Sequence, residues 1–277
     1  MSKLEDYKHE LEDNLKKYFQ EREQNYPMLA SQLFASVKYS VFGEGKRFRP
    51  ILSALTAEML GIPWARVIPW AAAIELVHTY SLIHDDLPCM DNDAIRRGKP
   101  TNHIVYGEAT ALLAGDALLT EAFRIIPVSY AAEPSVAVQL CRLLSEVSGL
   151  RGMVAGQLID IEAEKLVDLP IEKLIEMHEL KTGGLIRASV EGTGIIAGIN
   201  EKDKSALIEF GRNIGIAFQL ADDISDYNPA QAEKSGFPKL IGIEATRKLL
   251  DEYATTADRA LDVFGERAQD LIKMVPR

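Results

Sequence analysis

Cysteine is scarce in this sequence, with only Cys89 and Cys141 among 277 residues. Two cysteines cannot form the disulfide framework of a small secreted domain, and their positions do not suggest a zinc site. No apolar run is long enough to span a bilayer, and the first ten residues are too charged for a signal peptide. These absences predict a cytoplasmic protein without membrane insertion.

Positive charge is also in short supply. The chain has 31 Lys and Arg against 41 Asp and Glu, which gives a net charge of -10. Nucleic acids are bound chiefly through clustered Lys and Arg, so this balance argues against a nucleic-acid partner. An acidic protein can still bind phosphate groups if it recruits divalent cations, and a composition of 47% apolar residues can fill a sizeable core.

Alternating strand patterns are missing as well, because apolar residues recur at helical spacing almost throughout. The sequence has no repeat, no low-complexity tract and no flexible linker. We therefore predict an all-α protein that forms a single-domain helical bundle over residues 1–277. After two N-terminal helical segments, the expected helices cover residues 50–60, 66–89, 107–130, 133–161, 170–197, 201–227, 240–256 and 257–274.

What the sequence does contain is two dense aspartate clusters inside apolar helical sequence. The clusters are Asp85, Asp86 and Asp91, and Asp222, Asp223 and Asp226. Carboxylates in such surroundings need a partner, and a shared magnesium ion with a diphosphate is the usual one. The second cluster fits one face of a helix, whereas the first needs Pro88 to kink or end its helix. The simpler alternative is two solvated acidic helix ends.

Cationic and polar side chains form a second group of candidates. Lys46, Arg47 and Arg49 lie beside two glycines, and Arg96 and Arg97 follow the first aspartates closely. Guanidinium groups fit phosphate oxygens, although each run alone is more often an exposed basic turn.

Further polar residues lie inside apolar helices. His78 lies two helical turns before Asp85 and can donate to a diphosphate, or it can be a core histidine. Lys181, Thr182 and Gln219 are the other polar donors in such helices, and their simpler interpretation is packing and an interhelical hydrogen bond.

Taken in order, these motifs resemble those of the trans-isoprenyl diphosphate synthases, in particular the short-chain enzymes of the farnesyl and geranylgeranyl type. The matching segments cover residues 45–50, 78–86, 96–98, 156–157, 181–183 and 218–226. The resemblance implies the all-α isoprenoid synthase fold with a central cavity, and a homodimer. It also implies condensation of isopentenyl diphosphate with allylic diphosphates such as dimethylallyl and geranyl diphosphate, through ionisation, condensation and proton elimination.

The resemblance also implies a role for each matching residue. The aspartates would hold two to three magnesium ions with the diphosphate: Asp85, Asp86, Asp91, Asp222, Asp223 and Asp226. The isopentenyl diphosphate set would be Lys46, Arg49, His78 and Arg97. The allylic diphosphate set would be Arg96, Lys181, Thr182, Gln219 and Lys234, and three of these would also act in catalysis: Lys181, Thr182 and Gln219.

Product length would depend on Tyr80 and Ser81, which form the floor beneath the growing chain in this resemblance. Bulky Tyr80 predicts farnesyl diphosphate, with geranylgeranyl diphosphate as the alternative. The segment between Asp226 and Lys234 is shorter than the corresponding loop of the family, which leaves a noncatalytic regulatory relative as a further alternative. A terpene cyclase is disfavoured, because a single-substrate enzyme would not need the isopentenyl diphosphate set.

Overall fold

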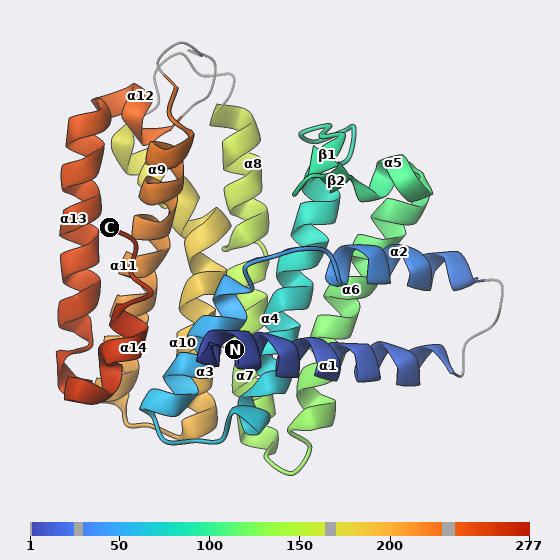
Figure 1. The fold of residues 1–277 in the computed structure, drawn as a ribbon, viewed down its shortest axis with the longest axis horizontal. Coiled ribbons are helices and arrows are strands. Elements are labelled where there is room, and N and C mark those ends of the chain that lie inside the picture. Colours follow the sequence, from blue (N-terminus) through green and yellow to red (C-terminus); the bar gives the residue numbers. More distant parts are fainter. Residues whose placement is uncertain (1, 25–29, 164–169, 229–235) are drawn as a thin grey trace. The chain divides into compact units, whose positions relative to one another are not determined.

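Helices make up most of the computed structural model, which describes residues 2–24, 30–163, 170–228 and 236–277 (Figure 1). The α-helices are α1 (Lys3–Glu23), α2 (Ser31–Val41), α3 (Phe48–Met59), α4 (Trp64–Asp85), α5 (Asn102–Tyr106), α6 (Glu108–Ser129), α7 (Pro134–Ser148), α8 (Met153–Ala163), α9 (Ile171–His178), α10 (Gly184–Ala197), α11 (Glu201–Asp226), α12 (Phe237–Ile241), α13 (Ile243–Ala260) and α14 (Gln269–Ile272). A π-helical turn (Glu179–Gly183) follows α9, and a 3-10 helix (Asp262–Ala268) precedes α14. The predicted all-α class is confirmed.

Contacts within the chain divide it into two compact units. The N-terminal unit comprises residues 1–54 and 64–141, and the C-terminal unit comprises residues 55–63 and 142–277. The first aspartate cluster belongs to the N-terminal unit, and the second belongs to the C-terminal unit.

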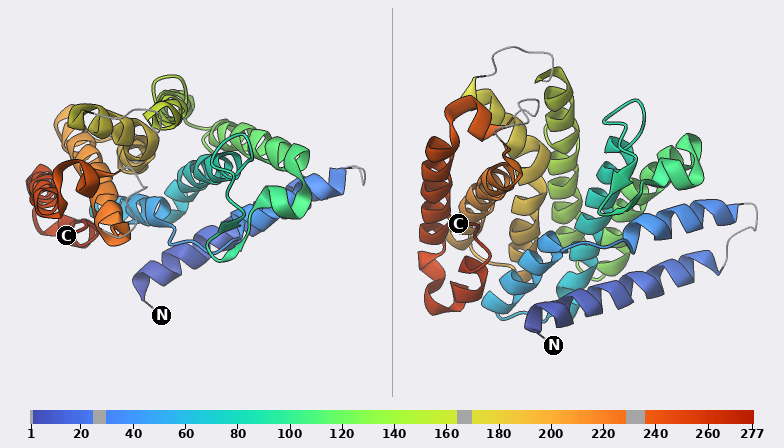
Figure 2. Two further views of the ribbon diagram at one scale, coloured as in Figure 1. Left: turned by 90° about the horizontal axis from the view of Figure 1, so that it is seen from above. Right: turned by 45° about the horizontal axis from the view of Figure 1, so that its top comes forward.

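In the N-terminal unit, α4 and α6 lie side by side and α1 crosses α4 (Figures 1 and 2). Trp70 and Leu76 of α4 and Leu118 of α6 are completely buried, so apolar burial holds these helices together. The helices approach closely at Gly115, where an added Cβ would lie 2.0 Å from Nε2 of His84. This glycine therefore sets the position of the α4 turn that leads into the first aspartate cluster.

A short antiparallel hairpin follows that cluster. It consists of β1 (Ile95–Arg96) and β2 (Lys99–Pro100), joined through Arg97 and Gly98, whose φ angles are 52° and 75°. The sequence pattern predicted no strand, because two-residue strands are too short to show an alternating pattern.

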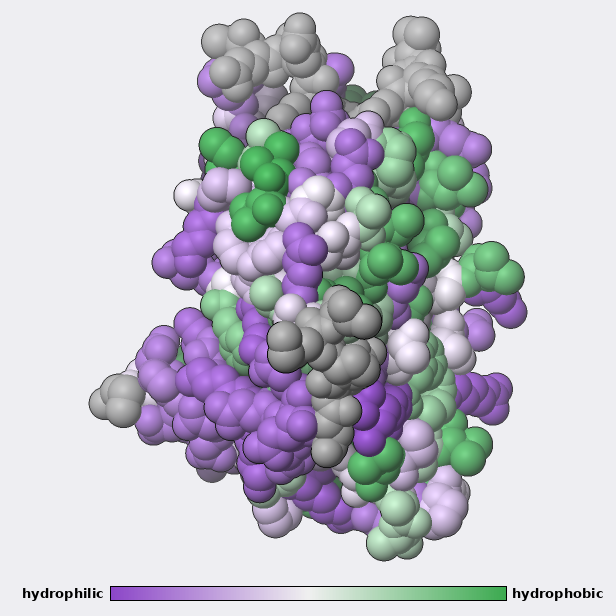
Figure 3. All heavy atoms as spheres, turned by 90° about the vertical axis from the view of Figure 1, so that its right-hand side faces the viewer, coloured by the Kyte–Doolittle hydropathy of each residue, from purple (hydrophilic) through white to green (hydrophobic). Residues whose placement is uncertain are grey.

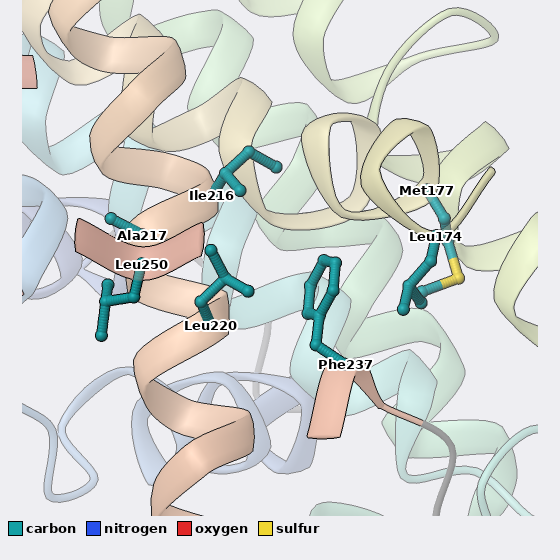
Figure 4. Close-up of a cluster of buried hydrophobic side chains, with 7 residues drawn as sticks. All are labelled: Leu174, Met177, Ile216, Ala217, Leu220, Phe237 and Leu250. Carbon is teal, nitrogen blue, oxygen red and sulfur yellow. The ribbon is translucent and has the colours of Figure 1, made fainter. Parts of the chain in front are cut away.

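In the C-terminal unit, α11 packs against both α10 and α13. The end of this unit that carries the second aspartate cluster has a core made of Leu174, Met177, Ile216, Ala217, Leu220, Phe237 and Leu250. Figure 4 shows the ring of Phe237 between Leu220 of α11 and the side chains of α9. Phe237 thereby anchors the beginning of α12 beside the last turns of α11.

Four predicted helix limits were wrong. The helix expected over 66–89 ends at Asp85, before Pro88. The helix expected over 133–161 is broken between Ser148 and Met153, where glycines begin and end the connection. The helix expected over 170–197 contains the π-helical turn, and α13 continues through the expected break after residue 256.

The surface carries apolar side chains between charged ones (Figure 3). The N-terminal unit exposes five of them on α5 and α6: Ile104, Val105, Leu112, Leu113 and Val128. Among the helices that the structure describes, none is long and apolar enough to cross a membrane.

Candidate active site

The first aspartate cluster lies at the C-terminal end of α4. The backbone N–H of Asp86 donates to the carbonyl of Leu82 over 3.2 Å, and that of Asp91 donates back to the carbonyl of Asp85 over 2.9 Å. The chain therefore folds back on itself after the helix, as a helix end near Pro88 allows. Asp86 is buried, Asp85 is half-buried and Asp91 is exposed.

Asp86 is held by an arginine of the hairpin. Oδ1 of Asp86 lies 2.5 Å from Nε of Arg96, and Nη2 of Arg96 lies 3.2 Å from Oδ2 of Asp93. Burial raises the pKa of Asp86, and the hydrogen bond and charge of Arg96 oppose that rise. Arg96 thus neutralises a carboxylate that the sequence assigns to magnesium.

The other candidate cations of this unit lie within or beside the segment 43–50. Nη1 of Arg97 donates to the carbonyl of Glu44 over 2.9 Å and lies 2.7 Å from where a Cβ of Gly45 would stand. Lys46 is exposed and Arg49 is half-buried. Burial, followed by the charges of Arg49 and Arg97, lowers the pKa of His78 well below its usual range, so its imidazole is neutral near pH 7.

A hollow of about 530 Å³, including its open mouth, connects several of these groups in the N-terminal unit. Its lining includes Asp86, Arg96 and Arg97, together with Thr79 and Gly43. An acidic oxygen and two guanidinium groups therefore face one space, which suits an anion that carries a divalent cation.

Tyr80 and Ser81 lie on α4 just before the first cluster. Tyr80 is buried, its ring contacts that of His84 at 5.7 Å, and its hydroxyl has no hydrogen-bond partner within the described residues. Burial and then the charge of Asp85 raise the pKa of Tyr80 to about 12. Ser81 donates to the carbonyl of His78 over 2.9 Å.

The second aspartate cluster ends α11 in the C-terminal unit. Asp222 and Asp226 are exposed, whereas Asp223 is half-buried and accepts two hydrogen bonds. Nε2 of Gln219 donates to its Oδ1 over 2.7 Å, and the backbone N–H of Phe237 donates to its Oδ2 over 3.0 Å. Burial raises the pKa of Asp223, and these two hydrogen bonds lower it in part.

Lys181 lies in the π-helical turn and pairs with Asp160 of α8, with 2.5 Å between Nζ and Oδ2. The two elements approach closely at Gly156, where a Cβ would lie 2.4 Å from the backbone nitrogen of Lys181. Such π-helical turns are frequent at functional sites. The lysine is therefore positioned by both a charge pair and a bare glycine backbone.

A chain of hydrogen bonds joins the π-helical turn to the second cluster. Oγ1 of Thr182 donates to Oε1 of Gln219 over 3.3 Å, and Nε2 of the same Gln219 donates to Asp223. The π-helical turn and α11 approach closely at Gly183 and Gly215, where a Cβ on Gly215 would lie 2.8 Å from Cα of Gly183. This approach of the two elements therefore also depends on glycine. The structure brings together three residues that the sequence singled out separately: Thr182, Gln219 and Asp223.

The donors present suit magnesium bound with a diphosphate rather than a preformed cage. In residues 2–24, 30–163, 170–228 and 236–277, no three His, Cys, Asp or Glu side chains are arranged to hold a metal ion. Magnesium typically takes one or two protein carboxylates and completes its shell with substrate phosphates and water. Asp85, Asp91, Asp222 and Asp226 supply such oxygen donors at the ends of α4 and α11.

Three groups that hold site residues were not predicted from the sequence. They are Asp160, the backbone N–H of Phe237, and Glu75, which pairs with Arg47. Asp160 follows the conspicuous Gly156-Gln157 pair by one helical turn, a signal that could have identified it. Lys234, by contrast, lies outside the described residues.

Comparison with known proteins of similar sequence and structure shows which class of protein this chain belongs to. A farnesyl diphosphate synthase of Micrococcus luteus is 41% identical over 248 residues, which cover 85% of this chain and 84% of the relative. A geranylgeranyl diphosphate synthase of Cyanophora paradoxa is 36% identical, covering 87% and 84%. The solved structure of an FPP/GFPP synthase from Zymomonas mobilis has a TM-score of 0.89 at 35% identity and covers 98% of each chain.

The fold is therefore that of the helical isoprenyl diphosphate synthases. The family model described as polyprenyl synthetase matches residues 30–237, and the chain belongs to this family. The resemblance inferred from the motifs is thereby confirmed.

Proposed function

We propose that this chain is a short-chain prenyltransferase that condenses isopentenyl diphosphate with dimethylallyl and geranyl diphosphate to give farnesyl diphosphate. Its family and the Micrococcus luteus relative, named farnesyl diphosphate synthase, support the proposal. The observation that carries it is the hollow of the N-terminal unit, where Asp86 lies beside Arg96 and Arg97. A magnesium diphosphate needs both carboxylate and guanidinium ligands.

Four side chains of the N-terminal unit are assigned to isopentenyl diphosphate: Lys46, Arg49, His78 and Arg97. Arg97 uses one N–H for the carbonyl of Glu44, and a guanidinium group has further donors for phosphate oxygens. Neutral His78 keeps one N–H for the same purpose. The low pKa of His78 thus matches a donor that works without carrying charge.

Arg96, Lys181, Thr182 and Gln219 are assigned as donors to the allylic diphosphate. Lys234, which lies outside the described residues, is assigned to the same group from its sequence position. The charge pairs of Arg96 with Asp86 and of Lys181 with Asp160 keep both cations balanced when no substrate is bound. Binding of the diphosphate offers each cation a second anionic partner.

The reaction begins when the allylic carbon–oxygen bond breaks and its electron pair leaves with the diphosphate. Arg96 and Lys181 stabilise the negative charge that develops on this leaving group. Magnesium, when held by the aspartates, supplies further positive charge to the departing oxygens. The double bond of isopentenyl diphosphate then attacks the allylic cation, and the proton lost from the condensed product passes to the released diphosphate.

Product length is assigned to Tyr80 and Ser81. Tyr80 is bulky and buried one helical turn before the first cluster, which supports a stop after two condensations beyond dimethylallyl diphosphate. A geranylgeranyl product is the second candidate, because the Cyanophora paradoxa relative is named for that product. Exposed apolar residues on α5 and α6, Ile104 and Leu113 among them, support a homodimer.

The test is an assay of the purified chain with magnesium, labelled isopentenyl diphosphate, and dimethylallyl or geranyl diphosphate. The condensed product is treated with phosphatase to remove its diphosphate group. The expected result is an alcohol with the mass and retention time of farnesol. A longer product would contradict the farnesyl assignment alone. The absence of every condensed product would contradict the proposed function.

A further inference from the structure

Arg47 is the middle cation of the Lys46–Arg49 run, but its surroundings differ from those of its neighbours. Its side chain is 1% exposed and its φ is 50°, in the left-handed region that non-glycine residues rarely adopt. Its carbonyl accepts the N–H of Ile51 over 3.0 Å, so it lies where the loop passes into α3. A strained, buried arginine at such a junction requires compensating contacts.

The guanidinium group of Arg47 is occupied by acceptors of the protein itself. Nη1 donates to Oε1 of Glu75 over 2.6 Å, and Nη2 donates to the carbonyls of Val41 over 2.6 Å and Gly43 over 3.4 Å. Nε lies 3.6 Å from Oε1 of Glu12. With its fork turned inward, Arg47 is not available to a diphosphate, unlike exposed Lys46.

Glu75 connects Arg47 to the part of α4 that carries His78. It is 3% exposed and lies one helical turn before His78 on α4, so the two side chains share a face. The charges of Arg47 and Glu75 both act on Arg97, and that of Arg47 acts on His78. The pair therefore lies next to two of the four groups assigned to isopentenyl diphosphate.

We infer that the buried Arg47–Glu75 pair positions the isopentenyl diphosphate site by fixing the start of α3, which lies between Lys46 and Arg49, to the turn of α4 that carries His78. The inference rests on the proposed function, which names the ligand of those residues. Arg47 and Glu75 are positioning residues, because neither touches the substrate. Removing one partner of a buried charge pair leaves the other charge uncompensated, so the loop has to rearrange.

The closing experiment measures binding of isopentenyl diphosphate by calorimetry, and steady-state kinetics with each substrate varied in turn. Glu75→Gln keeps the shape of the side chain and removes its charge. The expected result is about tenfold weaker binding and about tenfold higher KM for isopentenyl diphosphate, with kcat and the KM for geranyl diphosphate within about twofold. Arg47→Lys should act in the same direction, because a single ammonium group cannot reach all the acceptors.

Glu121→Gln is the matched control, because it removes the charge from the Arg22–Glu121 pair, 2.7 Å long, in the same unit. It should lower thermal stability without changing the affinity for isopentenyl diphosphate. If Glu75→Gln does not fold, Glu12→Gln provides the test, with a smaller loss of affinity of about threefold expected from its longer contact.

Unchanged affinity for isopentenyl diphosphate in Glu75→Gln, or equal losses for both substrates, would overturn the inference and leave the proposed function standing. An unmutated chain that binds isopentenyl diphosphate but forms no condensed product would refute the proposed function alone. An unmutated chain that does not bind isopentenyl diphosphate would overturn both.

Discussion

The carboxylate of Asp86 lies 2.5 Å from Nε of Arg96, so a residue assigned to magnesium is already paired with a cation of the same unit. Arg96 provides the positive charge that balances the buried carboxylate of Asp86. Binding of magnesium and a diphosphate would let Asp86 exchange that partner for the metal and let Arg96 turn to the phosphate oxygens.

Asp86→Asn should therefore lower kcat/KM on the order of a hundredfold and raise the magnesium concentration needed for half-maximal rate. The amide can still accept from Arg96, so the melting temperature should change little. Asp93→Asn is the matched control, because Asp93 also pairs with Arg96 but is exposed. An equal loss of activity in both variants would assign the effect to Arg96 rather than to a metal ligand.

Tyr80→Ala should lengthen the product, because it removes a buried ring one turn before the first aspartate cluster. Mass analysis of the dephosphorylated products gives the chain length directly. Tyr80→Phe keeps the ring and removes a hydroxyl that has no partner within the described residues, so the product should stay the same. The free energy of unfolding of Tyr80→Phe should be unchanged or higher by up to about 1 kcal/mol. A product of unchanged length from Tyr80→Ala would disprove the floor assignment.

His178 should make the protein sensitive to acid. It is 8% exposed, packs against the tilted ring of Phe237 with ring centroids 5.4 Å apart, and has a pKa lowered to about 4, chiefly by burial. Because the unfolded chain binds this proton near pH 6.5 and the folded chain does not, stability is complete above pH 6.5. It then falls toward pH 4 by about 1.4 kcal/mol per pH unit, or about 3 kcal/mol in all at most.

The measurement is the free energy of unfolding of the natural chain and of His178→Leu between about pH 4 and pH 7. A leucine side chain cannot titrate, so the variant should lose less stability than the natural chain over this range. Parallel curves would mean that His178 binds its proton equally well in the folded and unfolded chain, contrary to the expectation from its burial.

Gly215→Ala should destabilise the C-terminal unit by about 1–3 kcal/mol, because the new Cβ would stand 2.8 Å from Cα of Gly183. Gly183→Ala is its matched control. The nearest atom that a Cβ there would meet is the carbonyl oxygen of His178 at 3.5 Å, and the φ of Gly183 is -66°, which alanine adopts readily. Chemical denaturation of both variants measures their free energies of unfolding, and Gly215→Ala should lose more stability than Gly183→Ala. Equal losses would refute this prediction.

The aspartate clusters and the all-α class were predictable because they depend on local patterns: charge inside apolar helices and helical periodicity. The charge pairs that position the site residues could not be predicted in this way. Lys181 and Asp160 are brought together by the packing of α8 against the π-helical turn, which no local pattern encodes. The run that contains Arg47 was interpreted as suited to phosphate contact, but the burial of Arg47 against Glu75 became visible only in the tertiary structure.

The close approach at Gly156 has a practical consequence for engineering. The position of Lys181 depends on a space that exists only because a side chain is missing, so every replacement of Gly156 pushes on the backbone of the lysine. Directed evolution of product length would therefore do best with libraries that vary Tyr80 and Ser81 and keep Gly156 and Gly215 constant. In libraries that also varied the two glycines, most inactive clones with changes there would reflect a displaced backbone rather than a new specificity.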